Sequence, residues 1–156
     1  MNVLCIILAV ASALAIALFI LKYHILMNLA LNARSTNLLS SGDAAEIPAR
    51  EARVRRQIQE DGEWMDALPR EDVEILSQDG LRLVGHYIPA PGTPHRLVVL
   101  FHGWRGSWTG DFGSMGRWLR EIGCDLLLPE QRAQGASQGR YMGFGVLERR
   151  DVTQWL

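Results

Sequence analysis

Residues 135–139 read Gly-Ala-Ser-Gln-Gly and match the pattern G-x-S-x-G. In this pattern, a serine on a sharp turn between a strand and a helix can act as a nucleophile. The surroundings of Ser137 do not fit such a turn, because the apolar run before it ends at Leu128 and loop-like sequence lies on both sides. We therefore interpret Ser137 as a structural residue, whose hydroxyl bonds loop backbone while Gly135 and Gly139 permit a tight path.

A serine nucleophile also needs a base to activate it at neutral pH. In the strand–turn–helix arrangement the serine is followed along the chain first by an acid and then by a histidine. Asp151 follows Ser137, but all four histidines, at positions 24, 86, 95 and 102, precede it. The sequence therefore predicts no catalytic nucleophile, acid or base within this chain.

Net charge and cysteine content limit the kinds of partner and ligand that we expect for this chain. The formal net charge is −1 and the pI is about 6.4, so no basic field indicates binding to nucleic acid. The two cysteines, Cys5 and Cys124, form no spacing typical of a disulfide framework or a zinc site. We expect no metal site and no cofactor.

The first 21 residues carry no charge and are long enough to cross a bilayer as a helix. We predict a transmembrane anchor over residues 1–22, with the lipid bilayer as a partner. A cleaved signal peptide is the alternative, but no basic residue precedes Lys22 and the small residues at 11–13 lie mid-run. Lys22 and Arg34 favour a cytoplasmic C-terminal side, although two charges are too few to assign it.

Residues 23–69 are predicted to form a juxtamembrane helix and a linker. A cluster of arginines occurs within them, at positions 50, 53, 55 and 56. These side chains either contact anionic headgroups or form a solvated helix face balanced by neighbouring acids. We favour the solvated face.

Beyond residue 70 the pattern indicates alternating strands and helices. Residues 71–88 alternate around Asp79-Gly80 and predict a β-hairpin. The run RLVVLFHGW is continuously apolar and predicts a strand buried on both faces. A helix over 111–123, capped by Asp111 and ended by Gly123, is expected to bury Phe112, Met115, Leu119 and Ile122. The run CDLLLP then predicts a short buried strand, followed by a Gly-rich loop and a last helix from Gly145. This order predicts an α/β fold with a partly parallel sheet.

The order of these motifs resembles the N-terminal half of the α/β-hydrolase fold, in particular the membrane-anchored bacterial serine hydrolases. The stretches EDVEILSQDGLRLVGHYIPA, LVVLFHGWRGS, LLLPEQRAQGASQGRYMGFG and GVLERRDVTQW carry the likeness. It covers residues 70–156. The resemblance implies hydrolysis of an ester, lipid or small amide by a serine mechanism, with no cofactor.

The resemblance also implies roles for two loops. Backbone N–H groups of the loop after the third strand would stabilise an oxyanion, so the Trp104 N–H is our candidate donor, with His102 and Gly103 in the same loop. His102 either orders this loop or acts as a base, and we favour the first. Arg132, Gly135, Ser137 and Gly139 belong to the structural loop. Two positions depart from the family: Glu130 replaces aspartate and Gln134 replaces histidine, from which we expect some loss of loop order.

In the family, the nucleophile follows the next strand, and the acid and histidine come later. We therefore expect residues 70–156 to be an incomplete α/β-hydrolase domain, truncated before the nucleophile, that is inactive and unstable alone. The alternatives are a catalytically inactive membrane-tethered binding or structural protein and a nonfunctional gene fragment. The sequence does not identify the substrate.

Overall fold

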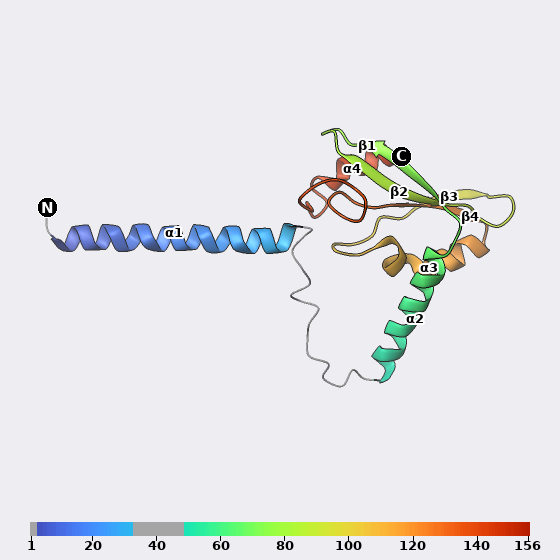
Figure 1. Cartoon of the computed structure of the whole chain (residues 1–156), viewed down its shortest axis with the longest axis horizontal. Coiled ribbons are helices and arrows are strands. Elements are labelled where there is room, and N and C mark those ends of the chain that lie inside the picture. The colour runs from blue at the N-terminus through green and yellow to red at the C-terminus, as the bar shows by residue number, and fades with distance from the viewer. Residues whose placement is uncertain (1–2, 33–48) are drawn as a thin grey trace.

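The computed structural model describes residues 3–32 and 49–156. Helix α1 (Val3–Leu31) extends away from a body that contains all the other elements (Figure 1). Residues 6–31 of this helix are long and apolar enough to cross a membrane. Residues 6–28 are exposed, whereas residues 29–31 are half-buried against the body. The described chain thus has one candidate membrane span, as the sequence predicts.

The body contains a four-stranded sheet in the order β1-β2-β4-β3. The strands are β1 (Glu71–Leu76), β2 (Arg82–Ile88), β3 (Arg96–Val99) and β4 (Cys124–Pro129). Pairs β1–β2 and β2–β4 are antiparallel, whereas β3 and β4 are parallel. The predicted fold class, an antiparallel hairpin joined to parallel strands with helices, is confirmed.

The turn between β1 and β2 fixes the register of the hairpin. Gly80 has φ +81°, a conformation open to glycine, and its N–H donates to Ser77 O at 3.0 Å. The Ser77 hydroxyl donates to Asp79 Oδ1 and accepts from the Leu81 N–H. With the turn set here, Asp72 lies opposite His86 across the two strands.

Strand β4 is central and buried along its whole length, as the sequence predicts. The prediction of a long strand buried on both faces at RLVVLFHGW is wrong. Strand β3 comprises only residues 96–99, and Leu97 is 55% exposed. The physical reason is packing: α3 covers β4, whereas the main contacts of β3 among the described elements are those with its neighbouring strand β4.

Helix α3 (Trp108–Glu121) begins earlier than predicted. Ser107, not Asp111, is its N-cap, because the Ser107 hydroxyl accepts from the Gly110 N–H at 3.0 Å. Asp111 lies in the first turn instead. The predicted helix end is confirmed, since Gly123 has φ +82° and its N–H donates to Arg120 O.

The predicted buried face of α3 is confirmed at Leu119, which is buried, and at Phe112, which packs against the core, but not at Met115 and Ile122. Met115 and Ile122 are 49% and 46% exposed, while Gly113 and Gly116 are buried. The reason is close packing of α2 (Ala49–Asp66) on the glycine side of α3. A Cβ on Gly113 would lie 2.6 Å from the backbone of Asp61, and one on Gly116 would collide with Met65.

Met65 is fully buried and belongs to the main apolar core, which therefore includes residues N-terminal to the predicted boundary at residue 70. The N-terminal part of α2 is exposed, and its Arg55 pairs with Glu51 at 2.8 Å.

Helix α4 (Glu148–Trp155) closes the described chain and begins later than Gly145. The Glu148 carboxylate accepts from the N–H groups of Gly143 and Gly145, which holds the preceding loop outside the helix. Trp155 packs so closely on Gly85 that a Cβ there would lie 2.9 Å from the indole ring.

Candidate functional site

The loop after β3 forms a tight turn in front of α3. The Gly106 N–H donates to Gly103 O at 3.0 Å, and the Asp111 carboxylate accepts from the Gly103 N–H at 2.8 Å. Arg105, at the third position of this turn, has φ +55°. Trp104, at the second position, has no positive φ, so the turn has the features of type II.

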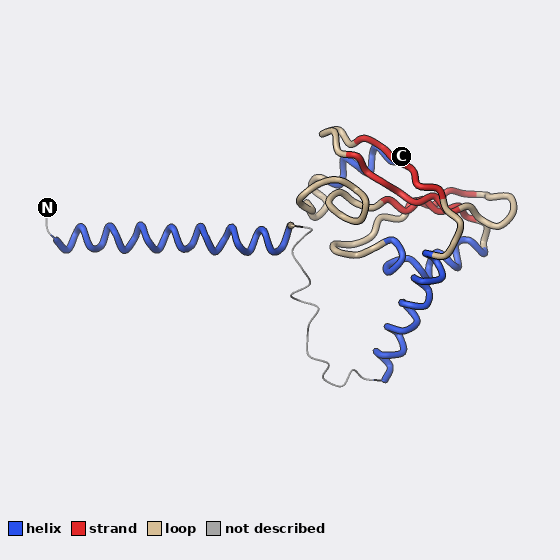
Figure 2. The backbone as a smooth tube through the Cα atoms, viewed as in Figure 1, coloured by secondary structure: helices blue, strands red, loops and turns tan. Residues whose placement is uncertain are grey.

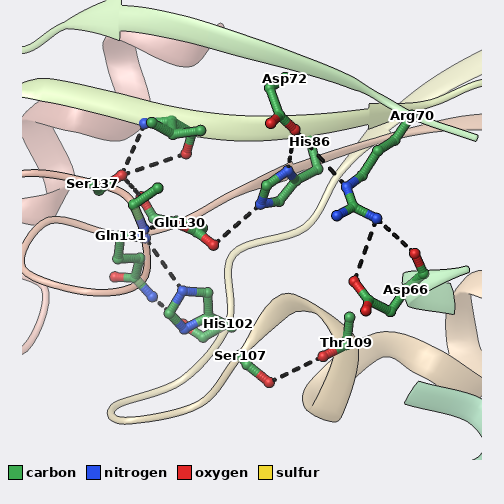
Figure 3. A network of polar contacts seen from close by, with 12 residues as sticks. Asp66, Arg70, Asp72, His86, His102, Ser107, Thr109, Glu130, Gln131 and Ser137 are labelled. Carbon is green, nitrogen blue, oxygen red and sulfur yellow. Dashed lines mark hydrogen bonds and ion pairs between the residues drawn. The ribbon is translucent and has the colours of Figure 1, made fainter. Parts of the chain in front are cut away.

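His102 joins this loop to the segment after β4 (Figure 3). It is only 3% exposed. The Gln131 N–H donates to its Nε2 at 3.2 Å, and the Gln131 side-chain amide donates to His102 O. Because Nε2 accepts, the ring proton lies on Nδ1, which is 3.0 Å from Gly103 O. Both ring nitrogens of His102 are therefore engaged in ordering the loop.

The Trp104 N–H is a candidate donor of the loop. Within residues 3–32 and 49–156 this N–H has no hydrogen-bond acceptor, whereas the Gly103 N–H is taken by Asp111. An N–H at a turn after a parallel strand can stabilise negative charge on a substrate oxygen. The chemistry that this site can supply is thus stabilisation of an oxyanion.

Ser137 belongs to the Gly-rich loop after β4 and lies against β2 (Figure 3). It is 7% exposed; its Oγ accepts from the Val84 N–H at 2.9 Å and donates to Glu130 O at 2.6 Å. None of the described serines is hydrogen-bonded to a histidine. The geometry places the Ser137 hydroxyl in a structural role, and its catalytic irrelevance stays a prediction.

Replacing Ser137 with alanine is expected to destabilise the fold without removing any esterase activity. Loss of the hydroxyl leaves the buried Val84 N–H without its acceptor, which lowers the free energy of unfolding by about 1–3 kcal/mol. Urea unfolding of the full chain would measure this cost, with Gln134→Ala in the same loop as the control. Unfolding curves that coincide for Ser137→Ala and Gln134→Ala would contradict the prediction.

The Glu130 carboxylate orders the rest of the Gly-rich loop. It accepts from the Ala136 N–H, and a Cβ on Gly135, at φ +51°, would collide with it. Gly139 also has a positive φ and lies against the Ala133 backbone. The sequence predicted a loss of loop order from glutamate at this position, whereas its longer side chain reaches loop backbone directly.

Arg132, also assigned to the structural loop, is buried and links three elements. Its guanidinium donates to both Asp151 oxygens at 2.7 Å and to both Asp79 oxygens at 3.0 Å. The hydrogen bonds that Arg132 donates to Asp151, and next those to Asp79, outweigh burial, which lowers the pKa of Arg132, and leave this pKa raised. This residue ties the β1–β2 turn to α4.

His86 forms a polar cluster that the sequence analysis missed (Figure 3). Its Nδ1 lies 2.7 Å from Asp72 and its Nε2 lies 3.1 Å from Glu130, with the Trp108 ring 4.5 Å away. The hairpin register around Asp79-Gly80 places Asp72 opposite His86 and would have revealed the first contact. Glu130 is distant in sequence, and only the fold brings it to His86.

Burial lowers the pKa of His86, but the two carboxylates outweigh it and raise this pKa above its usual 6.5. The stabilisation from His86 is therefore present in full below about pH 6.5 and is lost as the pH rises through the folded-state pKa. Burial raises the pKa of Glu130, but hydrogen bonds from His86 and Ala136 leave this pKa below 4.5. The stabilisation from Glu130 is therefore present above about pH 4.5 and is lost as the pH falls through its folded-state pKa.

We expect the free energy of unfolding to decrease from about pH 6.5 towards alkaline pH and this slope to be smaller in His86→Gln. Urea unfolding at a series of pH values would measure it. His95→Gln, at an exposed histidine, is the matched control. The same alkaline slope in wild type and His86→Gln would show that His86 does not carry the effect.

Comparisons with known proteins found similar chains only among solved structures. No known family and no curated protein matches the chain by sequence. An esterase from Pyrococcus furiosus is 27% identical over 58% of this chain and 36% of its own, with a TM-score of 0.49. The α/β hydrolase GrgF from a Penicillium species is 35% identical over 46% of this chain and 25% of its own, with a TM-score of 0.39.

An α/β serine hydrolase homologue from Coxiella burnetii is 23% identical over 55% of this chain and 42% of its own, with a TM-score of 0.45. The chain thus spans about a third of the length of the Pyrococcus esterase. Each of these proteins is substantially longer than the segment that this chain resembles.

Proposed function

We propose that this chain belongs to a membrane-anchored α/β hydrolase that cleaves ester bonds by a serine mechanism, and that it supplies the anchor and the oxyanion side of the site. The observation that supports this most is the Trp104 N–H, which lies in a turn after parallel strand β3 and has no acceptor among the described residues. His102 and Asp111 hold that turn in place. The substrate class is a small ester or a lipid.

We further propose that the nucleophile, acid and base lie outside residues 1–156. Ser137, the one serine in a G-x-S-x-G pattern, already has its hydroxyl engaged by Val84 and Glu130. Strand β3 has a free edge within the described sheet, beside which a further parallel strand could bring a nucleophile near Trp104.

A fluorophosphonate probe, which reacts with activated serines, tests this function. In native membranes we expect it to label a protein that an antibody against residues 70–156 recognises, at a serine outside residues 1–156. The purified chain of 156 residues is expected to stay unlabelled. Labelling of the purified chain that disappears in Ser137→Ala would instead assign the nucleophile to the Gly-rich loop.

The anchoring by α1 has its own test. The full chain is expected to stay in the membrane pellet on carbonate extraction, with its intact mass of 17.5 kDa. An arginine at the centre of a span costs about 2.5–3.5 kcal/mol of insertion free energy, so Leu14→Arg should release protein while Leu14→Ala should not. Release of wild-type protein at full mass would contradict the anchor, and a shortened mass would support the signal peptide.

A further inference from the structure

Two loops of the candidate site, the loop after β3 and the Gly-rich loop after β4, cap the C-terminal end of α1. The last carbonyls of a helix have no partner within the helix and need donors from elsewhere. Here the Arg105 guanidinium donates to Leu29 O at 2.6 Å, and the Trp104 indole donates to Ala30 O at 3.2 Å. The Met142 N–H donates to Leu31 O at 2.9 Å.

These bonds tie the candidate membrane span to the loop that carries the Trp104 N–H. Figure 2 shows loops of the body gathered at the end of α1, with most of the strands farther from this helix. A positive guanidinium at this end of the helix also complements the negative pole of the helix dipole. The span and the loop are thus positioned together.

The length of α1 sets the depth of its C-terminal end. Its 29 residues extend about 43 Å at 1.5 Å per residue. A bilayer including its headgroup layers is about 40–45 Å thick. A helix that begins at one face therefore ends at the headgroup layer of the other, and its capping loops lie at that level.

The surface around this helix end combines exposed aromatic and aliphatic side chains with two arginines, of which Arg140 is exposed and Arg105 is half-buried. Phe144 and Val146 are 61% and 65% exposed, and Trp104 is 44% exposed and stacks on Phe144 with ring centroids 5.6 Å apart. Arg105 lies over the Trp104 ring at 4.6 Å, and Arg140 lies over Tyr141 at 5.0 Å. Tryptophan and tyrosine are enriched at membrane interfaces, and arginine is attracted to anionic headgroups.

We propose that this interfacial surface, formed by Trp104, Arg105, Arg140, Tyr141, Phe144 and Val146, rests on the headgroup layer of an anionic bilayer. The proposal depends on the anchoring by α1 proposed above. Three observations support it: the capping of α1 by these loops, the match between helix length and bilayer thickness, and the aromatic and basic composition. The Trp104 N–H then faces substrates presented by the bilayer, which narrows the proposed substrate class to esters of membrane amphiphiles.

Nitroxide labels on the full chain, reconstituted in phosphatidylcholine and phosphatidylglycerol vesicles, test this surface. Labels are placed by Val146→Cys and Phe144→Cys in a Cys5→Ala, Cys124→Ala background. Leu97→Cys is the matched control, because Leu97 is an exposed apolar residue of β3, which lies away from α1 (Figure 1). Collision with a water-soluble nickel chelate measures exposure to water, and carbonate extraction of the same vesicles measures insertion.

We expect collisions with the chelate to fall several-fold on reconstitution at positions 144 and 146 and to stay unchanged at position 97. Arg140→Glu should restore access at position 146, whereas Arg96→Glu, at an exposed arginine of β3, should not. Equal access at positions 146 and 97 in carbonate-resistant vesicles would overturn the interfacial surface alone. Loss of the chain on carbonate treatment would overturn the anchor and the surface with it.

Discussion

Replacing Arg132 with leucine is expected to lower the free energy of unfolding by about 3–5 kcal/mol, because it leaves a buried carboxylate without its partner. Asp151 is 4% exposed and receives two hydrogen bonds of 2.7 Å from Arg132. Asp79 is paired at 3.0 Å, but its side chain is 57% exposed, so water screens that pair. The Asp151 contact therefore dominates the loss.

This loss is a large fraction of the total free energy of unfolding, which is about 5–15 kcal/mol for a typical domain. Urea unfolding of the full chain in detergent, followed by tryptophan fluorescence, would measure it. Arg82→Leu is the matched control, because Arg82 pairs with Glu74 at 2.8 Å on the surface and should cost less than about 1 kcal/mol. Adding Asp151→Asn to Arg132→Leu should recover part of the stability. A cost no larger than that of Arg82→Leu would contradict a dominant buried pair.

The elements that were predicted correctly have local signals. Asp79-Gly80 sets the hairpin, the buried run 124–129 gives β4, and Gly123 ends α3 through its left-handed conformation. Each depends on a few adjacent residues, so the sequence pattern contains the required information. The candidate donor Trp104 was instead implied by the resemblance to α/β hydrolases, and its role stays a prediction.

The errors have tertiary causes. A continuous apolar run does not reveal whether both faces of its strand are covered, and Leu97 of β3 proves to be 55% exposed. Met115 and Ile122 were wrongly placed on the buried face of α3, because the residues that α2 approaches are glycines, which contribute little to a hydrophobic pattern. Likewise, the contacts of Arg132 join residues 53 and 19 positions apart, and no local pattern encodes them.

In the complete hydrolase proposed above, replacing Trp104 with proline is expected to lower kcat about 10²–10³-fold. This is the cost of removing one oxyanion donor. Proline lacks an N–H but suits this position, because proline is common at the second residue of a type II turn. Trp104 occupies that position, between Gly103 and Arg105, which has φ +55°. The substitution should therefore remove the donor while preserving the turn.

Trp104→Ala separates the backbone from the side chain. It keeps the N–H but removes the indole, which bonds Ala30 O and stacks on Phe144. Alanine should therefore weaken the attachment of the loop to α1 while retaining oxyanion stabilisation, so its kcat should lie far above that of the proline variant. Steady-state hydrolysis of a p-nitrophenyl ester measures both. Equal kcat values in the two variants would mean that the Trp104 N–H does not contact the reacting oxygen, because only proline removes that group.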